Sequence, residues 1–110
     1  MDESTFQRAA DEALESVRRA LGPAAEEHGF EVDYNAGTLS IEFEEPAAAR
    51  FVLSPNTPVR QVWVSALSKS FKLEWSQGKT AFVWGETGET LRDLIARVVG
   101  TQLGTAIELE

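Results

Sequence analysis

Residues 30–44 read FEVDYNAGTLSIEFE, and this stretch decides the fold. Apolar side chains recur at every second position on both sides of the short segment Asn35-Ala36-Gly37. Successive side chains of a β-strand point to opposite faces, so this alternation predicts two half-buried strands joined by a tight hairpin turn. One face of the resulting sheet is therefore expected to be apolar and the other polar.

Four more short strands are expected after this hairpin. They fall in residues 51–53, 60–67, 71–75 and 80–84, and polar, proline or glycine segments separate them. Connections this short leave no room for crossover helices, so the six strands are predicted to form an antiparallel meander.

A helix is predicted before the strands. Ser4 and Gln7 have the spacing of a capping box, which marks a helix start. Apolar residues then recur at helical spacing until Gly22-Pro23, where the helix is expected to end. Residues 24–29 are interpreted as a linker to the first strand.

A second helix is predicted after the strands, opening at Thr90 and ending near Gly104. Each helix has one apolar stripe, and two such helices can both bury their stripes on one face of the sheet. The expected fold class is therefore α+β, a two-layer α/β sandwich with two helices on one face of an antiparallel sheet of about six strands. Residues 1–110 are expected to form a single domain.

Composition narrows the function classes. The chain has 110 residues, no Cys, one His and a net charge of -8, and residues 1–45 hold twelve acidic and three basic side chains. An acidic surface repels nucleic acid and anionic lipid, so neither is expected as a partner. No run of about 18 apolar residues is present, so no transmembrane helix is expected. Without Cys there is no disulfide, thiolate zinc site or thiol nucleophile.

Trp63 is the most informative departure from the alternating pattern. If Val62 and Val64 face the core, then Trp63 lies on the open polar face together with Gln61. Exposed tryptophans often anchor protein interfaces. The alternatives are a reversed register or a loop that covers the ring. Trp75 and Trp84 lie in more apolar runs and are expected to pack in the core.

Paired acids are the second candidate feature. Asp11 and Glu15 are one helical turn apart, and Glu31 and Asp33 are two residues apart on a strand, so each pair points in one direction. Paired carboxylates suit hard cations, including iron. The alternative is a solvated helix face, stabilised by ion pairs with the basic residues Arg8, Arg18 and Arg19. The sequence contains none of the common catalytic motifs.

Three blocks of sequence point to a known family. Residues 56–65 (NTPVRQVWVS), preceded by residues 37–43 (GTLSIEF) and followed by residues 88–95 (GETLRDLI), resemble the frataxin family and its bacterial CyaY branch. Residues 1–11 are similar to the first helix of that family. The resemblance runs nearly end to end and implies the same two-layer sandwich.

The resemblance also implies a function in iron-sulfur cluster assembly, without covalent chemistry of its own. It implies weak binding of iron, as Fe²⁺ or Fe³⁺, through an acidic ridge, and contact with a cysteine desulfurase and an iron-sulfur scaffold protein. The matching ridge positions are Asp2, Glu3, Asp11, Glu12, Glu15, Glu31 and Asp33. The matching partner-binding positions are Asn56, Gln61, Trp63 and Lys72.

Four residues depart from the bacterial pattern. Arg18, Arg19, Gly22 and Pro23 stand where bacterial members usually continue the acids, so the ridge is interrupted. The alternative functions are a ferroxidase or iron-storage protein and a pure interaction module. The expected location is the bacterial cytoplasm, or the mitochondrial matrix if the chain is a processed eukaryotic protein. A monomer that forms oligomers with iron is expected.

Overall fold

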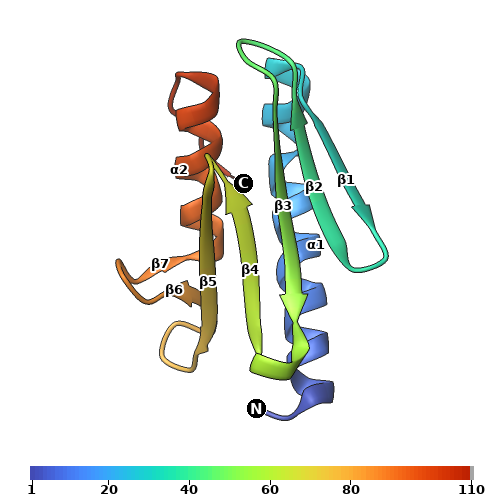
Figure 1. Cartoon of the computed structure of the whole chain (residues 1–110), viewed down its shortest axis with the longest axis vertical. Coiled ribbons are helices and arrows are strands. Elements are labelled where there is room, and N and C mark those ends of the chain that lie inside the picture. Colours follow the sequence, from blue (N-terminus) through green and yellow to red (C-terminus); the bar gives the residue numbers. More distant parts are fainter. Residues whose placement is uncertain (110) are drawn as a thin grey trace.

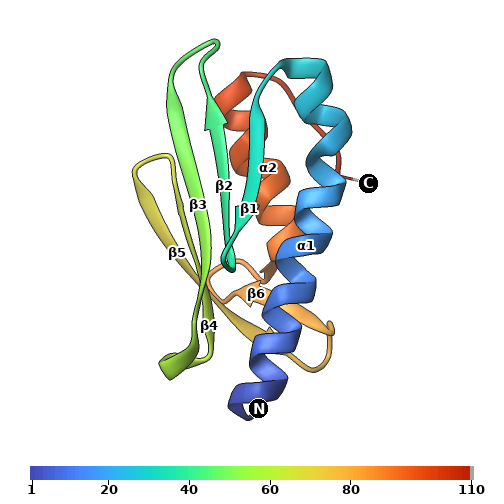
Figure 2. The ribbon, with the colours of Figure 1, turned by 90° about the vertical axis from the view of Figure 1, so that its right-hand side faces the viewer.

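The computed structural model describes residues 1–109 and forms two layers, with a helical layer on one face of a single sheet (Figures 1 and 2). The seven strands pair in the order β1 to β7, each antiparallel to its neighbour. The elements are α1 (Glu3–His28), β1 (Glu31–Asn35), β2 (Thr38–Phe43), β3 (Ala49–Asn56), the 3₁₀-helix η1 (Thr57–Val59), β4 (Gln61–Ala66), β5 (Lys69–Ser76), β6 (Ala81–Trp84), β7 (Glu89–Thr90) and α2 (Leu91–Leu103). The two-layer α+β prediction is confirmed.

The core fills the space between the helices and the sheet. Phe6 on α1 meets Phe82 on β6 edge-to-face with 5.8 Å between ring centres, and Phe82 meets Trp75 on β5 at 5.2 Å. Phe6 and Phe82 are almost fully buried. Among residues 1–109 no helix combines the length and apolarity needed to cross a bilayer.

The sheet has seven strands among the described residues, where about six were expected. The extra strand is β7, in which Thr90 pairs with Val83 and Glu89 pairs with Trp84. Two residues are too short to show an alternating pattern, so the sequence gives no signal for β7. Thr90 also caps α2, because its hydroxyl accepts a hydrogen bond from Asp93 N at 3.2 Å, which confirms the predicted start of that helix.

The prediction that α1 ends at Gly22-Pro23 was wrong, because the helix continues to His28. Proline inside a helix removes one backbone hydrogen bond and costs about 3 kcal/mol. Ala24 beyond Pro23 is buried against the core, so tertiary packing favours continuation of the helix past the proline. The actual end is Gly29, whose left-handed backbone (φ 77°) places its N–H on Ala25 O. Residues 24–28 are therefore the last turns of α1 and not a linker.

The start of α1 also differs from the prediction. Asp2, not Ser4, is the N-cap, and its carboxylate accepts a hydrogen bond from Thr5 N at 2.7 Å. Asp, Ser and Thr all cap helices by the same contact, so three neighbouring candidates made the start ambiguous. The capping hydrogen bond lowers the pKa of Asp2.

Strand β3 runs through Pro55, where the sequence predicted a break. Pro55 pairs with Val62 on β4, whereas the pairing of β2 with β3 ends at Leu39 and Leu53. On its β2 side Pro55 therefore has no neighbouring strand, so this end of β3 is an edge, where sheets tolerate proline. The break comes instead at η1, and Arg60 leaves it with a left-handed backbone (φ 55°).

One ion pair joins the last strand to α2 and gives a pH-dependent prediction. Arg97 donates from Nε and Nη2 to the Glu89 carboxylate at 2.8 and 3.0 Å, and these bonds lower the pKa of Glu89. A lowered carboxyl pKa stabilises the fold above the unfolded value of 4.5 and stops doing so as the pH falls through the folded value.

We therefore expect Glu89→Gln to lower the free energy of unfolding by about 0.5 kcal/mol at neutral pH, a small effect because Arg97 is 46% exposed. Urea unfolding at neutral pH and at about pH 3 checks this. Wild type and variant should converge at the lower pH. An equal difference at both pH values would show that the ion pair is not the cause.

Candidate functional site

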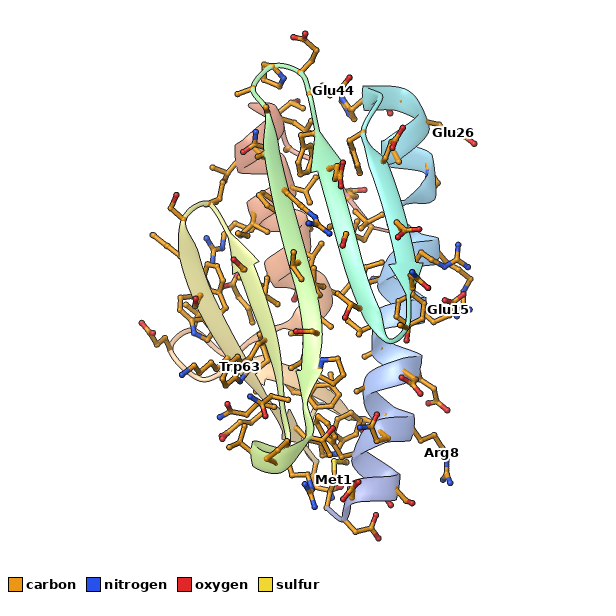
Figure 3. The ribbon with its side chains drawn as sticks, turned by 45° about the vertical axis from the view of Figure 1, so that its right-hand side comes forward. Met1, Arg8, Glu15, Glu26, Glu44 and Trp63 are labelled. Carbon is orange, nitrogen blue, oxygen red and sulfur yellow. The ribbon has the colours of Figure 1, made fainter. Side chains whose placement is uncertain are left out.

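The first candidate surface lies on the open face of β4 and β5, and we call Gln61, Trp63, Lys72 and Glu74 the tryptophan surface. Trp63 is 38% exposed, while its neighbours Val62 and Val64 are buried. The outward register predicted for Trp63 is confirmed, and Figure 3 shows its side chain projecting from the face that the helices leave open.

The strand register brings these four side chains into contact. Gln61 lies opposite Glu74, and Trp63 lies opposite Lys72. Trp63 Nε1 donates to Gln61 Oε1 at 2.8 Å, and Gln61 Nε2 donates to Glu74 Oε2 at 3.1 Å. Lys72 Nζ lies 4.8 Å from the centre of the indole, a cation–π distance. The indole N–H is thus satisfied within the chain, and the exposed part of Trp63 is its ring.

The remaining partner-binding position, Asn56, lies beside this surface. It ends β3 and pairs with Gln61 on β4, so all four predicted partner-binding residues fall on adjacent strands. Trp75 and Trp84 differ from Trp63, since both are half-buried and pack on the core. Their rings contact Phe82 and Phe71 at 5.2 and 4.8 Å, as their apolar surroundings predicted.

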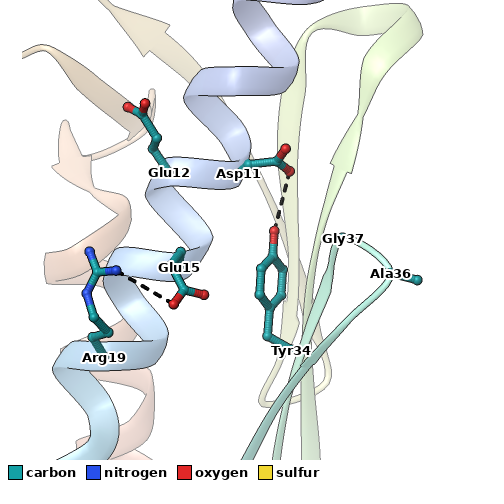
Figure 4. Close-up of a pocket in the computed structure, with 7 residues that line it drawn as sticks. All are labelled: Asp11, Glu12, Glu15, Arg19, Tyr34, Ala36 and Gly37. Atoms are coloured by element: carbon teal, nitrogen blue, oxygen red, sulfur yellow. Dashed lines mark hydrogen bonds and ion pairs between the residues drawn. The ribbon is translucent and has the colours of Figure 1, made fainter.

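The second candidate surface lies between α1 and the β1–β2 hairpin, and we call Asp11, Glu12, Glu15 and Tyr34 the acidic helix surface. These side chains line an open depression of about 540 Å³ (Figure 4). Tyr34 Oη donates to Asp11 Oδ1 at 3.3 Å. Partial burial raises the pKa of Tyr34, and the charge of Asp11 raises it further. The phenol therefore stays protonated and holds one carboxylate of the surface.

Glu15 is engaged by its own helix. Arg18 Nε donates to Glu15 Oε2 at 3.0 Å, and Arg19 Nη1 lies 3.6 Å from Glu15 Oε1. The Arg18 hydrogen bonds lower the pKa of Glu15. The ion-paired helix face that the sequence left as an alternative is therefore present at this position. The two arginines neutralise part of the negative charge that the composition suggested.

The structure does not bring all the predicted ridge residues together. Glu31 and Asp33 are exposed on the open face of the sheet, whereas Tyr34 and α1 lie on the other side of β1. Glu31 faces Glu42 across the strand pair, and Arg50 Nε lies 3.6 Å from Glu42 Oε1. The ridge expected as one surface is therefore two, because alternate residues of β1 point to opposite faces.

Asp2 and Glu3 lie at the start of α1. Asp11 lies nine positions after Asp2, about 14 Å along the helix at 1.5 Å per residue. Within residues 1–109 no three His, Cys, Asp or Glu side chains come together in an arrangement that could hold a metal ion. The described residues thus offer pairs of carboxylates and not a preformed ligand set for iron.

Tyr34 and Glu74 contribute to the two surfaces, although neither was predicted from the sequence to be a site residue. For Glu74 a signal existed, because it lies two residues from Lys72 on β5 and so shares its outward face. For Tyr34 the contact with Asp11 joins residues 23 positions apart, and such a pairing needs the packing of α1 on β1.

Comparison with known proteins places the chain. Residues 1–105 match the family described as the frataxin-like domain. The chain is 28% identical over 99 residues to the iron-sulfur cluster assembly protein CyaY of Azotobacter vinelandii, and the match covers 88% of each chain. It is 24% identical over 110 residues to the protein of the same name in Pseudomonas fluorescens, and that match covers 100% of this chain and 96% of the relative. A solved frataxin from Psychromonas ingrahamii has the same fold, with a TM-score of 0.80 at 20% identity over 98% of this chain and 97% of that one. The chain belongs to the frataxin family.

Proposed function

We propose that this chain is an accessory protein of iron-sulfur cluster assembly in the bacterial cytoplasm, which docks on a cysteine desulfurase and its scaffold protein and binds iron weakly. The observation that carries the proposal is the exposed Trp63 on the open sheet face of a frataxin-family fold. Its relatives in Azotobacter vinelandii and Pseudomonas fluorescens are named as iron-sulfur cluster assembly proteins. On this proposal the chain acts by docking and not by covalent chemistry of its own.

The tryptophan surface supports the proposed docking of this chain on a partner protein. Large aromatic side chains anchor interfaces because they bury much apolar area at a low cost in conformational entropy. Polar side chains surround Trp63, and Glu74 and Lys72 give both signs of charge close to the ring. A partner that covers the ring would meet charged groups at the edge of the contact.

The iron part rests on the exposed carboxylates. Hard cations prefer carboxylate oxygens, and Asp11 and Glu12 lie on the helix while Glu31 and Asp33 lie on the sheet. Each group is open to solvent and lacks a third converging ligand among residues 1–109. Iron bound at such places would keep most of its water ligands and exchange readily, as expected of cargo.

The two separate acidic surfaces give a prediction for iron binding. We expect the double charge reversals Asp11→Lys/Glu15→Lys and Glu31→Lys/Asp33→Lys each to weaken Fe²⁺ binding by about three- to tenfold, because each removes local negative charge. Anaerobic calorimetric titration with Fe²⁺ measures this. The effects should multiply when the two are combined, because the surfaces lie on different faces of the sheet.

A reversal remote from both surfaces serves as the control. Glu86 lies in the connection between β6 and β7, at the edge of the sheet opposite β1, and Glu86→Lys should leave Fe²⁺ binding near the wild-type value. Unchanged iron binding in both double variants would remove these carboxylates from the proposal. Sustained oxygen consumption over many turnovers with Fe²⁺ would instead favour the ferroxidase alternative.

The docking part is tested with the purified partners. The chain should bind a cysteine desulfurase–scaffold complex from the same bacterium and change the rate at which the desulfurase turns over cysteine. No binding and no change in rate would contradict the proposed function. The direction of the rate change depends on the partner enzyme.

A further inference from the structure

We propose that Glu74 is a positioning residue for docking, because it fixes the amide of Gln61 and thereby holds the Trp63 indole in one orientation. The inference rests on the proposed docking function and deepens it. It assigns a role to a side chain that was not predicted from the sequence to be a site residue.

The Gln61 amide has one direction that satisfies both of its neighbours. An ionised carboxylate can only accept hydrogen bonds, so the group that Gln61 turns toward Glu74 must be its NH₂, 3.1 Å away. The amide oxygen then faces the opposite way, toward the Trp63 N–H, 2.8 Å away. Without Glu74 the amide is free to turn over, and its NH₂ would then face the indole N–H, donor against donor. The contact that orients Trp63 thus depends on a carboxylate that does not touch it.

Lys72 restrains the indole from a second side. It pairs with Trp63 across β4 and β5, and its ammonium lies 4.8 Å from the ring centre. The indole is therefore held at its N–H by Gln61 and at its ring by Lys72. A side chain that is already ordered in the free protein loses less conformational entropy on binding, which favours affinity.

The three restraining side chains are peripheral to the core. Glu74 and Lys72 are exposed and Gln61 is half-buried, while the buried residues of β5 are Phe71 and Leu73 on the opposite face. Changes at Glu74 should therefore alter the orientation of Trp63 without unfolding the sheet. This separation allows a positioning role to be measured apart from stability.

The first test is nuclear magnetic resonance of the indole N–H groups. The chain has three tryptophans, and the signal of Trp63 is assigned by its loss in Trp63→Phe. We expect Glu74→Ala to shift this signal and to speed its exchange with water by about three- to tenfold, as the loss of one hydrogen-bond partner implies. Glu74→Asp keeps an acceptor-only group and should restore most of the wild-type behaviour. Glu44→Ala removes a remote charge and should change nothing.

The second test is affinity for the purified cysteine desulfurase–scaffold complex. Glu74→Ala should weaken binding by about three- to tenfold, and Glu74→Asp should recover most of the loss. An unchanged Trp63 signal in Glu74→Ala would overturn the proposal, and so would a changed signal with unchanged affinity. No binding by the wild-type chain would overturn the proposed function itself, whereas the signal of the free protein would still decide whether Glu74 orients Trp63.

Discussion

Replacing Trp63 with alanine is expected to weaken binding to the cysteine desulfurase–scaffold complex by about thirtyfold or more. Central aromatic anchors of interfaces typically cost 2 kcal/mol or more when truncated, and each 1.4 kcal/mol is about a factor of ten in affinity. Trp63 is the one large aromatic side chain exposed by more than a third within residues 1–109. Calorimetric titration of the purified complex with wild type and Trp63→Ala measures the loss.

Two variants control for unfolding and for general changes to the face. Trp63→Phe keeps an aromatic ring but loses the Nε1 contact to Gln61, so its affinity should fall between those of wild type and Trp63→Ala. Ser65→Ala changes the next outward residue of β4 and should bind as wild type does. Equal affinities of Trp63→Ala and wild type would remove the open sheet face from the proposed function.

The largest loss of stability is expected from Phe82→Ala, at about 3–5 kcal/mol. Phe82 is 1% exposed and lies between Phe6 of α1 and Trp75 of β5, so its removal leaves a cavity where the helical layer meets the sheet. Domains of this size have about 5–15 kcal/mol in total, so the loss is a large part of it. Thermal unfolding should show a midpoint lower by about 15 °C or more.

The neighbouring residue provides the matched control. Val83 follows Phe82 on β6, points to the other face of the sheet and is only half-buried. Val83→Ala should cost about 1 kcal/mol or less, since it opens no cavity between the layers. Similar losses for the two variants would mean that Phe82 does not join the layers as its ring contacts indicate.

The architecture could be predicted because alternation in a strand is a local signal. The alternation of apolar residues from Phe30 to Phe43 shows which face of the first hairpin is apolar, whatever elements pack beside it. The same alternation along β4 places Trp63 on the open face. The end of α1 could not be predicted in this way. Pro23 is a local signal to stop, and the burial of Ala24, which favours continuing the helix, exists only in the folded chain.

The candidate site shows the same limit. Alternate residues of β1 point to opposite faces, so the sequence alone places Asp33 on the other face from Tyr34. The separation of the acidic residues into two surfaces could therefore have been predicted from the sequence. The resemblance to a family instead implied that these acids form a single ridge. The contact of Gln61 with Glu74 depends on the register of β4 with β5, which the two-residue turn at Leu67 and Ser68 sets. Both turn residues have a left-handed backbone, and neither Leu nor Ser is a usual signal for such a turn.

The order of the strands also bears on how the chain reaches its native state. Every strand of the sheet pairs with the strand next to it in sequence, so the meander can grow by closing one short loop after another. Helix α1 is different, because Phe6 must find Phe82 near the far end of the chain. Contacts this distant in sequence are slow to form. Helix α1 leaves the ribosome before the sheet and is thus among the last elements to complete its packing, and until then the sheet keeps part of its apolar face uncovered.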